Sequence, residues 1–312
     1  MAEAHSHHHS AANYSRAFAI GVVLNIGFVI VEALFGWKIG SLALLADAGH
    51  NLSDVAGLLL AWAAFGAARI KPNRRHTYGW RRASILASFV NATVLLVAMG
   101  SLLWEAAHRL QMPASVDGLT VIWVASIGVI INSVTAWLFM KGSQHDLNIR
   151  GAFLHMAADA LVSVGVVMAG LLTLWRGWLW IDPVVSILIA LIIIAGTWSL
   201  FRRSLHLLFD GVPEGIHLDQ IEDSLLALPG VLAVHDLHVW AMSTEENALT
   251  AHLVCEQLTD LPSILLRQAT GVINTQFGIE HVTLQCEPAA FAEQCALSPD
   301  CMPGTGGQRA SS

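Results

Sequence analysis

Residues 42–67, LALLADAGHNLSDVAGLLLAWAAFGA, form an apolar stretch that is long enough to cross a bilayer and still carries Asp47, His50 and Asp54. On a helix, side chains three and four positions apart share one face, so these three residues form one stripe. A second apolar stretch, residues 152–174, carries His155 and Asp159 at the same four-residue spacing. Ionisable side chains at membrane depth are energetically costly, so we interpret these residues as a functional site.

The two His-x-x-x-Asp pairs together offer two imidazole nitrogens and two carboxylate oxygens, a tetrahedral ligand set suited to Zn²⁺. We therefore predict that His50, Asp54, His155 and Asp159 form one metal site. Asp47 is expected to be auxiliary, either by orienting the ligands or by carrying a proton, and a hydrogen bond between packed helices is the alternative. The spacing recurs as His206-x-x-x-Asp210 outside the apolar segments, so spacing alone is a weak indicator.

The composition of the chain is that of a polytopic membrane protein. Of its 312 residues, 55% are hydrophobic and only 12% are charged, whereas soluble domains have about 25% charged residues. Six apolar segments reach spanning length, namely residues 17–35, 42–67, 83–104, 119–140, 152–174 and 183–200. The first ten residues are polar and lack the pattern of a secretory signal peptide.

Positive charge sorts the connecting loops into two groups. Most Arg and Lys side chains flank the bundle or follow the second and fourth segments, whereas the opposite side has only Lys38, Arg109 and Arg176. By the positive-inside rule, we predict a multi-pass protein of the inner (plasma) membrane with both termini in the cytoplasm. The C-terminal quarter, which holds all four cysteines, is then cytoplasmic, so we interpret them as free thiols or metal ligands. These are Cys255, Cys286, Cys295 and Cys301.

Beyond Arg203 the composition changes to that of a small soluble domain. Residue patterns predict helices over 217–228 and 262–277 and strands over 231–242, 249–256 and 281–287. The order α-β-β-α-β indicates an α+β fold of the ferredoxin-like kind. We therefore divide the chain into a His-rich cytoplasmic tail (1–16), a six-helix transmembrane domain (17–203), a C-terminal α+β domain (204–290) and a disordered tail (291–312).

Four motifs resemble the cation diffusion facilitator family: GSLALLADAGHNLSDV (40–55), HTYGWRR (76–82), LHMAAD (154–159) and VHDLHVW (234–240). Their order and spacing match over residues 17–290, and the chain is most similar to the bacterial zinc exporters with a His/Asp transport site. The resemblance implies a homodimeric zinc/proton antiporter that serves metal resistance, with Zn²⁺ as substrate and Cd²⁺ and other divalent cations as further candidates. His50, Asp54, His155 and Asp159 would form the transport site of each protomer.

The resemblance also implies metal binding and dimerisation in the C-terminal domain. His235, His252 and Glu287 fall where relatives bind regulatory zinc near the dimer interface. Gln285 stands where some members have a histidine, so Cys286 and His238 are the alternative candidates to complete the ligand set. Ordinary strand-packing roles are the alternative for these residues.

Two further features are suggested at the ends of the membrane domain. His76 resembles a ligand of an additional zinc site, although Trp80 stands where a second histidine can occur. Arg82 and Asp210 resemble a charged pair that ties the loop after the second segment to the soluble domain at the dimer hinge. The N-terminal tract of His5, His7, His8 and His9 is expected to be a flexible zinc-collecting tail.

Other functional classes fit the chain less well. A zinc protease would need a His-Glu-x-x-His motif, and no His is followed by Glu in this sequence. A nucleotide-driven pump would need a Gly-Lys phosphate-binding loop, and none of the three lysines follows a glycine. We therefore expect no enzyme, and no nucleotide or nucleic acid among the partners. The best alternative is a membrane-bound zinc sensor that does not transport, which leaves the six spans unexplained.

Overall fold

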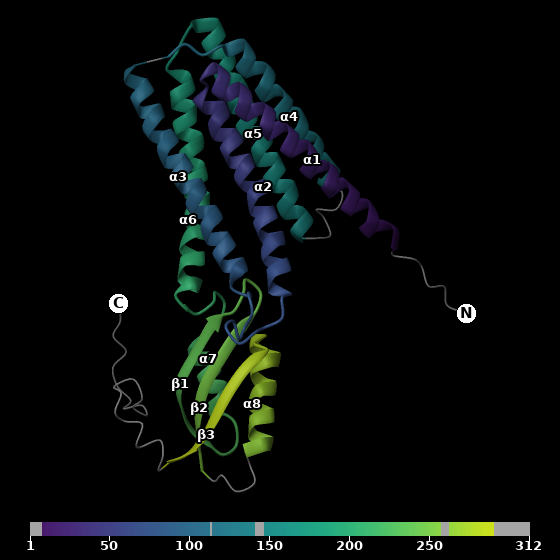
Figure 1. The fold of residues 1–312 in the computed structure, drawn as a ribbon, viewed down its shortest axis with the longest axis vertical. Coiled ribbons are helices and arrows are strands. Elements are labelled where there is room, and N and C mark those ends of the chain that lie inside the picture. Colours follow the sequence, from purple (N-terminus) through teal and green to yellow (C-terminus); the bar gives the residue numbers. More distant parts are fainter. Residues whose placement is uncertain (1–7, 113, 141–146, 257–261, 290–312) are drawn as a thin grey trace, which may run out of the picture. The chain divides into compact units, whose positions relative to one another are not determined.

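The computed structural model describes residues 8–112, 114–140, 147–256 and 262–289 (Figure 1). The long helices are α1 (His8–Ile39), α2 (Leu42–Ala68), α3 (Ala83–Gln111), α4 (Gly118–Met140), α5 (Leu147–Arg176) and α6 (Ile181–Leu208). They are followed by α7 (Leu218–Leu226), β1 (Val231–Ala241), β2 (Asn247–Cys255), α8 (Pro262–Phe277) and β3 (His281–Pro288). The chain forms two compact units, the first with Ser88–Phe201 and the residues up to Trp62, the second with Ala63–Ala87 and the residues from Arg202 onward.

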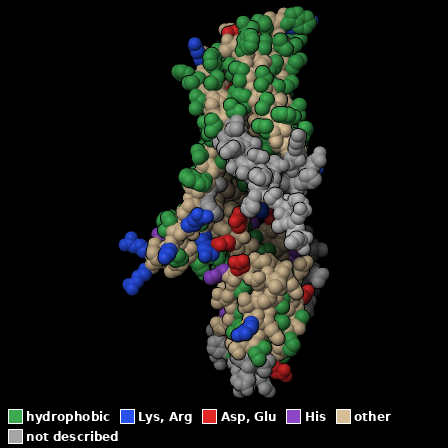
Figure 2. Space-filling model, turned by 90° about the vertical axis from the view of Figure 1, so that its right-hand side faces the viewer, with side chains coloured by type: hydrophobic (Ala, Val, Ile, Leu, Met, Phe, Trp, Pro, Cys, Tyr) green, Lys and Arg blue, Asp and Glu red, His purple; other side chains and the backbone are tan. Residues whose placement is uncertain are grey.

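The first unit is a bundle of apolar helices. Helices α2 to α6 each contain a stretch long and apolar enough to cross a membrane, and α1 is 32 residues long. Large hydrophobic side chains cover its surface (Figure 2), and Val97, Trp123 and Leu161 are 68%, 66% and 73% exposed. An apolar surface of this extent matches lipid rather than water. The predicted fold class, a helical membrane domain followed by a small α+β domain, is confirmed.

The helices extend further than the predicted apolar segments. Helix α1 begins at His8, within the predicted N-terminal tail, and α3 continues to Gln111. Helix α6 continues through His206 to Leu208. Hydropathy marks where a segment stops being apolar, whereas the backbone hydrogen bonds of a helix continue into polar sequence.

The core of the bundle is built from large and small side chains together. Phe28, Leu44 and Met99 are almost fully buried, and fully buried alanines such as Ala46 and Ala125 fill the positions between them. Small side chains let membrane helices approach closely, which favours packing in the absence of a hydrophobic driving force between them. This close packing brings the polar stripes of α2 and α5 together.

The C-terminal domain has the predicted α-β-β-α-β order. Its sheet has the strand order β1-β2-β3, with β1 antiparallel and β3 parallel to the central strand β2. Helix α8 supplies the crossover that a parallel pair of strands requires. Helices α7 and α8 share a hydrophobic core with the sheet, in which Ile221, Leu249 and Ile273 are fully buried. The opposite face of the sheet remains available for polar side chains.

The loop between α2 and α3 is tied to the C-terminal domain by charged and polar contacts. Arg82 Nη2 pairs with Asp210 Oδ1, as the family resemblance implied. Arg81 Nη1 lies 2.9 Å from Glu246 Oε2, and the Thr244 amide donates to Ser84 Oγ at 3.1 Å. The ion pair of Arg82 is therefore confirmed, while its role as a dimer hinge stays a prediction.

Candidate metal centres

The intramembrane candidates come from two helices, His50 and Asp54 from α2 and His155 and Asp159 from α5. His50 Nε2 lies 3.7 Å from Asp54 Oδ2 and 3.5 Å from Asp159 Oδ1. His155 Nε2 lies 3.2 Å from Asp54 Oδ2 and 3.6 Å from Asp159 Oδ2. Each imidazole thus faces both carboxylates, and the four side chains make a closed arrangement that we call the transmembrane ring.

The nitrogen–oxygen contacts in this ring have the length expected between metal ligands. Ligand atoms of His50, Asp54 and His155 all lie within 4.8 Å of one another, whereas Asp159, which contacts both histidines, does not lie within this distance of all three. Ligand atoms about 2.0–2.2 Å from a tetrahedral zinc ion lie about 3.3–3.6 Å from each other, whereas most hydrogen bonds are shorter. The Oδ2 atoms of Asp54 and Asp159 are buried and have no hydrogen-bond partner among the described residues. A cation at the centre would satisfy both oxygens, because it would replace the missing donors.

Exposure differs sharply around the ring. The side chain of Asp159 is 3% exposed, that of His50 23%, that of Asp54 36% and that of His155 41%. The ring is therefore buried on the Asp159 side and accessible on the His155 side. An ion that must enter and leave needs such an accessible side, whereas a purely structural zinc site is closed.

Asp47 does not belong to the ring, although it lies on the same helix stripe. Its Oδ2 atom accepts a hydrogen bond from Ser163 Oγ of α5 at 3.0 Å. On α1, the carboxyl group of Glu32 lies within hydrogen-bonding reach of Asp47 and of Asn51. Spacing along the chain does not reveal that Glu32 and Asp47 are neighbours. The sequence signal for this pair was Glu32 itself, a carboxylate inside an apolar segment.

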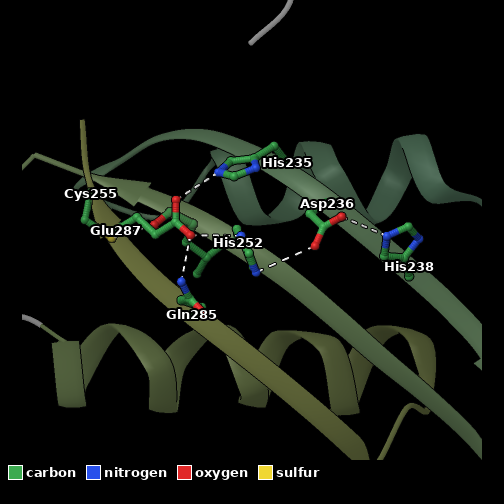
Figure 3. A network of polar contacts seen from close by, with 8 residues as sticks. His235, Asp236, His238, His252, Cys255, Gln285 and Glu287 are labelled. Carbon is green, nitrogen blue, oxygen red and sulfur yellow. Dashed lines mark hydrogen bonds and ion pairs between the residues drawn. The ribbon is translucent and has the colours of Figure 1, made fainter. Parts of the chain in front are cut away.

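A second group of candidate ligands lies on the face of the C-terminal sheet that points away from its hydrophobic core (Figure 3). His235 and His252 are opposite each other on β1 and β2, with ring centroids 5.0 Å apart. Glu287 is 1% exposed and contacts both, with Oε2 3.2 Å from His235 Nε2 and Oε1 2.8 Å from His252 Nδ1. The three residues that we predicted to be ligands are therefore close together, and we call them the cytoplasmic cluster.

The residues that contact this cluster, Gln285 and Asp236, are not the ones that we predicted to complete its ligand set. Gln285 Nε2 donates to Glu287 Oε1 at 2.8 Å, so it holds the carboxylate in place. Cys286 lies between these two on β3, and alternation turns its side chain toward the hydrophobic core instead. His238 contacts Asp236 at 2.9 Å, and Asp236 in turn lies 3.7 Å from His252 (Figure 3).

Asp236 owes this position to an irregularity in β1. The pairing register shifts between His235 and His238, and Asp236 adopts a φ of 52°. A bulge with one residue in the left-handed region breaks the alternation of side chains, and Asp tolerates that region better than most residues. Sequence periodicity assumes a regular strand, so it did not identify Asp236 as part of this network.

The remaining candidates belong to neither group. His76 stacks on the ring of Trp80 with centroids 4.6 Å apart, and the metal-binding groups found among the described residues do not include it. His206 contacts the Val212 carbonyl oxygen at 3.0 Å, whereas Asp210 pairs with Arg82, so the third His-x-x-x-Asp copy is split. His5 and His7 lie outside the described residues, as do Cys295, Cys301 and residues 291–312.

Two family models match consecutive parts of this chain. One is described as the cation efflux transmembrane domain and matches residues 18–209. The other is described as the cation efflux protein cytoplasmic domain and matches residues 213–289.

Curated relatives match over similar lengths. The "Cadmium, cobalt and zinc/H(+)-K(+) antiporter" of Bacillus subtilis is 35% identical, covering 93% of this chain and 94% of its own. The "Metal cation efflux system protein CzcD" of Cupriavidus metallidurans is 35% identical over 96% of both chains. "Zinc transporter ZitB" of Escherichia coli is 37% identical over 96% of this chain and 95% of its own. A solved metal-bound C-terminal domain of the Cupriavidus CzcD transporter is 35% identical and covers 23% of this chain and 99% of its own, with a TM-score of 0.22.

Proposed function

The chain belongs to the cation efflux family, and from this premise we propose that it exports Zn²⁺ from the cytoplasm in exchange for protons. Relatives of nearly the same length are named for the transport of zinc, cadmium and cobalt, and one of them is named a proton-linked antiporter. Cd²⁺ is the expected second substrate, because it accepts the same imidazole and carboxylate ligands.

The observation that carries this proposal is the spacing of the transmembrane ring. The four contacts between imidazole nitrogens and carboxylate oxygens are 3.2–3.7 Å long, which is close to the edge length of a zinc-centred tetrahedron. Ligand atoms of His50, Asp54 and His155 all lie within 4.8 Å of one another, and Asp159, which is not part of that group of three, contacts both histidines. Two imidazoles favour Zn²⁺ over Mg²⁺ and Ca²⁺, which prefer sites made of oxygen atoms alone. The two carboxylates balance the charge of the divalent ion.

The same ligands explain why protons would drive export. Zinc binds a neutral imidazole and an ionised carboxylate, so metal and protons compete for His50, Asp54, His155 and Asp159. If the ring opens to the cytoplasm and to the outside in turn, a low external pH favours release of zinc outside. When the protonated ring faces the cytoplasm again, its protons leave there and zinc can bind again.

We further propose that the protein works as a homodimer in the inner membrane with both termini in the cytoplasm. The match of residues 213–289 to the cytoplasmic domain of the family supports this arrangement. Zinc in the cytoplasmic cluster would then be regulatory, because His235 and His252 lie outside the membrane helices. Glu287 provides the negative charge that retains the ion.

Zinc flux into proteoliposomes tests the function. We expect His50→Ala and Asp159→Ala each to abolish flux, because each removes one of four ligands. Both variants should keep the expression level and dimerisation of the parent. His108→Ala is the matched control, since His108 is an exposed histidine in the last turn of α3.

The outcome also separates transport from sensing. A membrane-bound zinc sensor would bind zinc in detergent yet give no flux in the unmutated protein. Undiminished flux in either ring variant would show that the ring is not the transport site.

A further inference from the structure

Glu32 and Asp47 form a buried pair of carboxyl groups beside the transmembrane ring. Glu32 lies on α1 and Asp47 on α2, and both residues are 0% exposed. Their carboxyl groups lie within hydrogen-bonding reach of each other. We propose that this carboxyl pair binds a proton that is exchanged for Zn²⁺, an inference that rests on the antiport function proposed above.

Three of the four oxygen atoms of the pair accept no hydrogen bond, and Nδ2 of the nearby Asn51 is itself without a partner among the described residues. Both carboxylate oxygens of Glu32 and the Oδ1 atom of Asp47 are buried and have no hydrogen-bond partner among the described residues. The fourth oxygen, Asp47 Oδ2, accepts from Ser163 Oγ at 3.0 Å. Two ionised carboxylates so close together in a low-dielectric interior repel each other strongly. One proton held between them removes one charge and supplies a donor.

The surroundings leave a proton as the available counter-charge. Among the described residues, the ionisable groups that interact with Asp47 through their charge or a hydrogen bond are Glu32, Asp159 and His50. The ionisable group that interacts in this way with Glu32 is Asp47. Of these, His50 is a ligand of the proposed ring and cannot stay protonated while zinc is bound there. A buried charge without a partner is costly, so the pair is stable when it holds a proton.

The pair is connected to the ring along two helices. Asp47 lies one turn before His50 on α2, and its partner Ser163 lies one turn after Asp159 on α5. At this separation, the charge of a zinc ion in the ring favours the fully ionised pair. Zinc entry from the cytoplasm would break the O–H bond of the pair, leave the electron pair on the carboxylate and pass the proton to cytoplasmic water. Reprotonation from outside would form the O–H bond again as zinc leaves.

A glycine on α4 makes room for this arrangement. A Cβ atom at Gly128 would lie 2.5 Å from Phe28 Cζ and 3.1 Å from Ser163 Oγ. Phe28 precedes Glu32 by one turn on α1. The missing side chain therefore lets α1 and α5 approach α4 closely, which holds Ser163 against Asp47.

Glu32→Gln tests the proposal, because glutamine keeps the size of the side chain and does not take up the proton. In proteoliposomes that carry a zinc dye and a pH dye, we expect the variant to lose zinc-driven proton movement. An imposed pH gradient should no longer accelerate its zinc flux. Zinc binding by the purified full-length variant should be retained, because the ring is intact. The control is Glu105→Gln, which changes an exposed carboxylate of α3 and should keep full coupling.

The possible results are distinct. Proton movement per zinc equal to that of the parent would overturn the assignment, and so would loss of zinc binding together with coupling. Should Glu32→Gln fail to fold, Asp47→Asn in the same assay gives the same expected loss. Absence of pH-driven zinc flux in the unmutated protein would instead refute the antiport function itself.

Discussion

Cys255 and Cys286 lie next to the cytoplasmic cluster without belonging to it. Both are free thiols, and Cys255 is buried in the domain core. Burial raises the pKa of the Cys255 thiol to about 11, and the neighbouring Cys286 adds to this effect. Zinc binds the thiolate, so a thiol that stays protonated is a poor ligand. The sequence allows the cysteines to be either free thiols or metal ligands. For Cys255, the free thiol is the better interpretation.

We predict that Cys255 of the folded protein resists alkylation at about pH 8 and reacts faster only as the pH approaches its pKa. The same raised pKa means that the unfolded chain loses this proton first, so stability falls as pH rises from about 9 to about 11. Timed alkylation followed by peptide mass spectrometry measures the reaction. The urea-unfolded chain serves as the control, and rapid labelling of the folded protein at about pH 8 would contradict the prediction.

Helix α5 carries two of the four residues of the transmembrane ring, and it packs closely against α4. A Cβ atom at Gly170 of α5 would lie 2.9 Å from Ile122 Cγ1 and 3.1 Å from the Gly118 carbonyl oxygen of α4. The two backbones therefore approach closely at this point. His155 and Asp159 are carried by the same helix α5, so its distance from α4 helps to fix the ring.

We predict that Gly170→Ala destabilises the protein by about 1–3 kcal/mol, because the added methyl group forces α4 and α5 apart. Zinc flux should fall with it. Gly165→Ala on the same helix is the matched control, since a Cβ atom there meets nothing within 4 Å. That change should be neutral or stabilise by roughly 0.5–1 kcal/mol. Thermal unfolding of both variants in detergent gives the comparison, and equal midpoints would refute the packing argument.

Elements with regular patterns were predictable from sequence, and tertiary neighbours were not. Helix α2 begins at the predicted Leu42, and the order and type of the elements after Arg203 are as predicted, because apolar runs and alternation report local structure directly. The ring was predictable because both of its pairs repeat one spacing. The pairing of Glu32 with Asp47 depends on how α1 packs against α2, and the position of Asp236 depends on a bulge. Neither leaves a periodic signal in the sequence.

At the scale of the whole molecule, the two candidate metal centres differ in spacing and exposure. The transmembrane ring is spaced for a cation and partly accessible, as an exchanging site must be. The cytoplasmic cluster has shorter contacts, and Glu287 at its centre is fixed by Gln285 as well as by both histidines. A carboxylate held from three sides is suited to retention of an ion, because less reorganisation is needed when the ion binds.

We therefore predict that each protomer of the proposed homodimer holds one zinc ion in each of the two groups. Native mass spectrometry of the full-length protein should find that Asp159→Ala loses one ion per protomer, that Glu287→Ala loses the other and that the double variant loses both. His108→Ala should keep both ions. At a free zinc concentration about 100 times the dissociation constant, each occupied site stabilises the folded protein by about 2.7 kcal/mol. A chelator should therefore lower the unfolding midpoint of the parent more than that of Glu287→Ala. An unchanged zinc count in Glu287→Ala would place the second ion elsewhere.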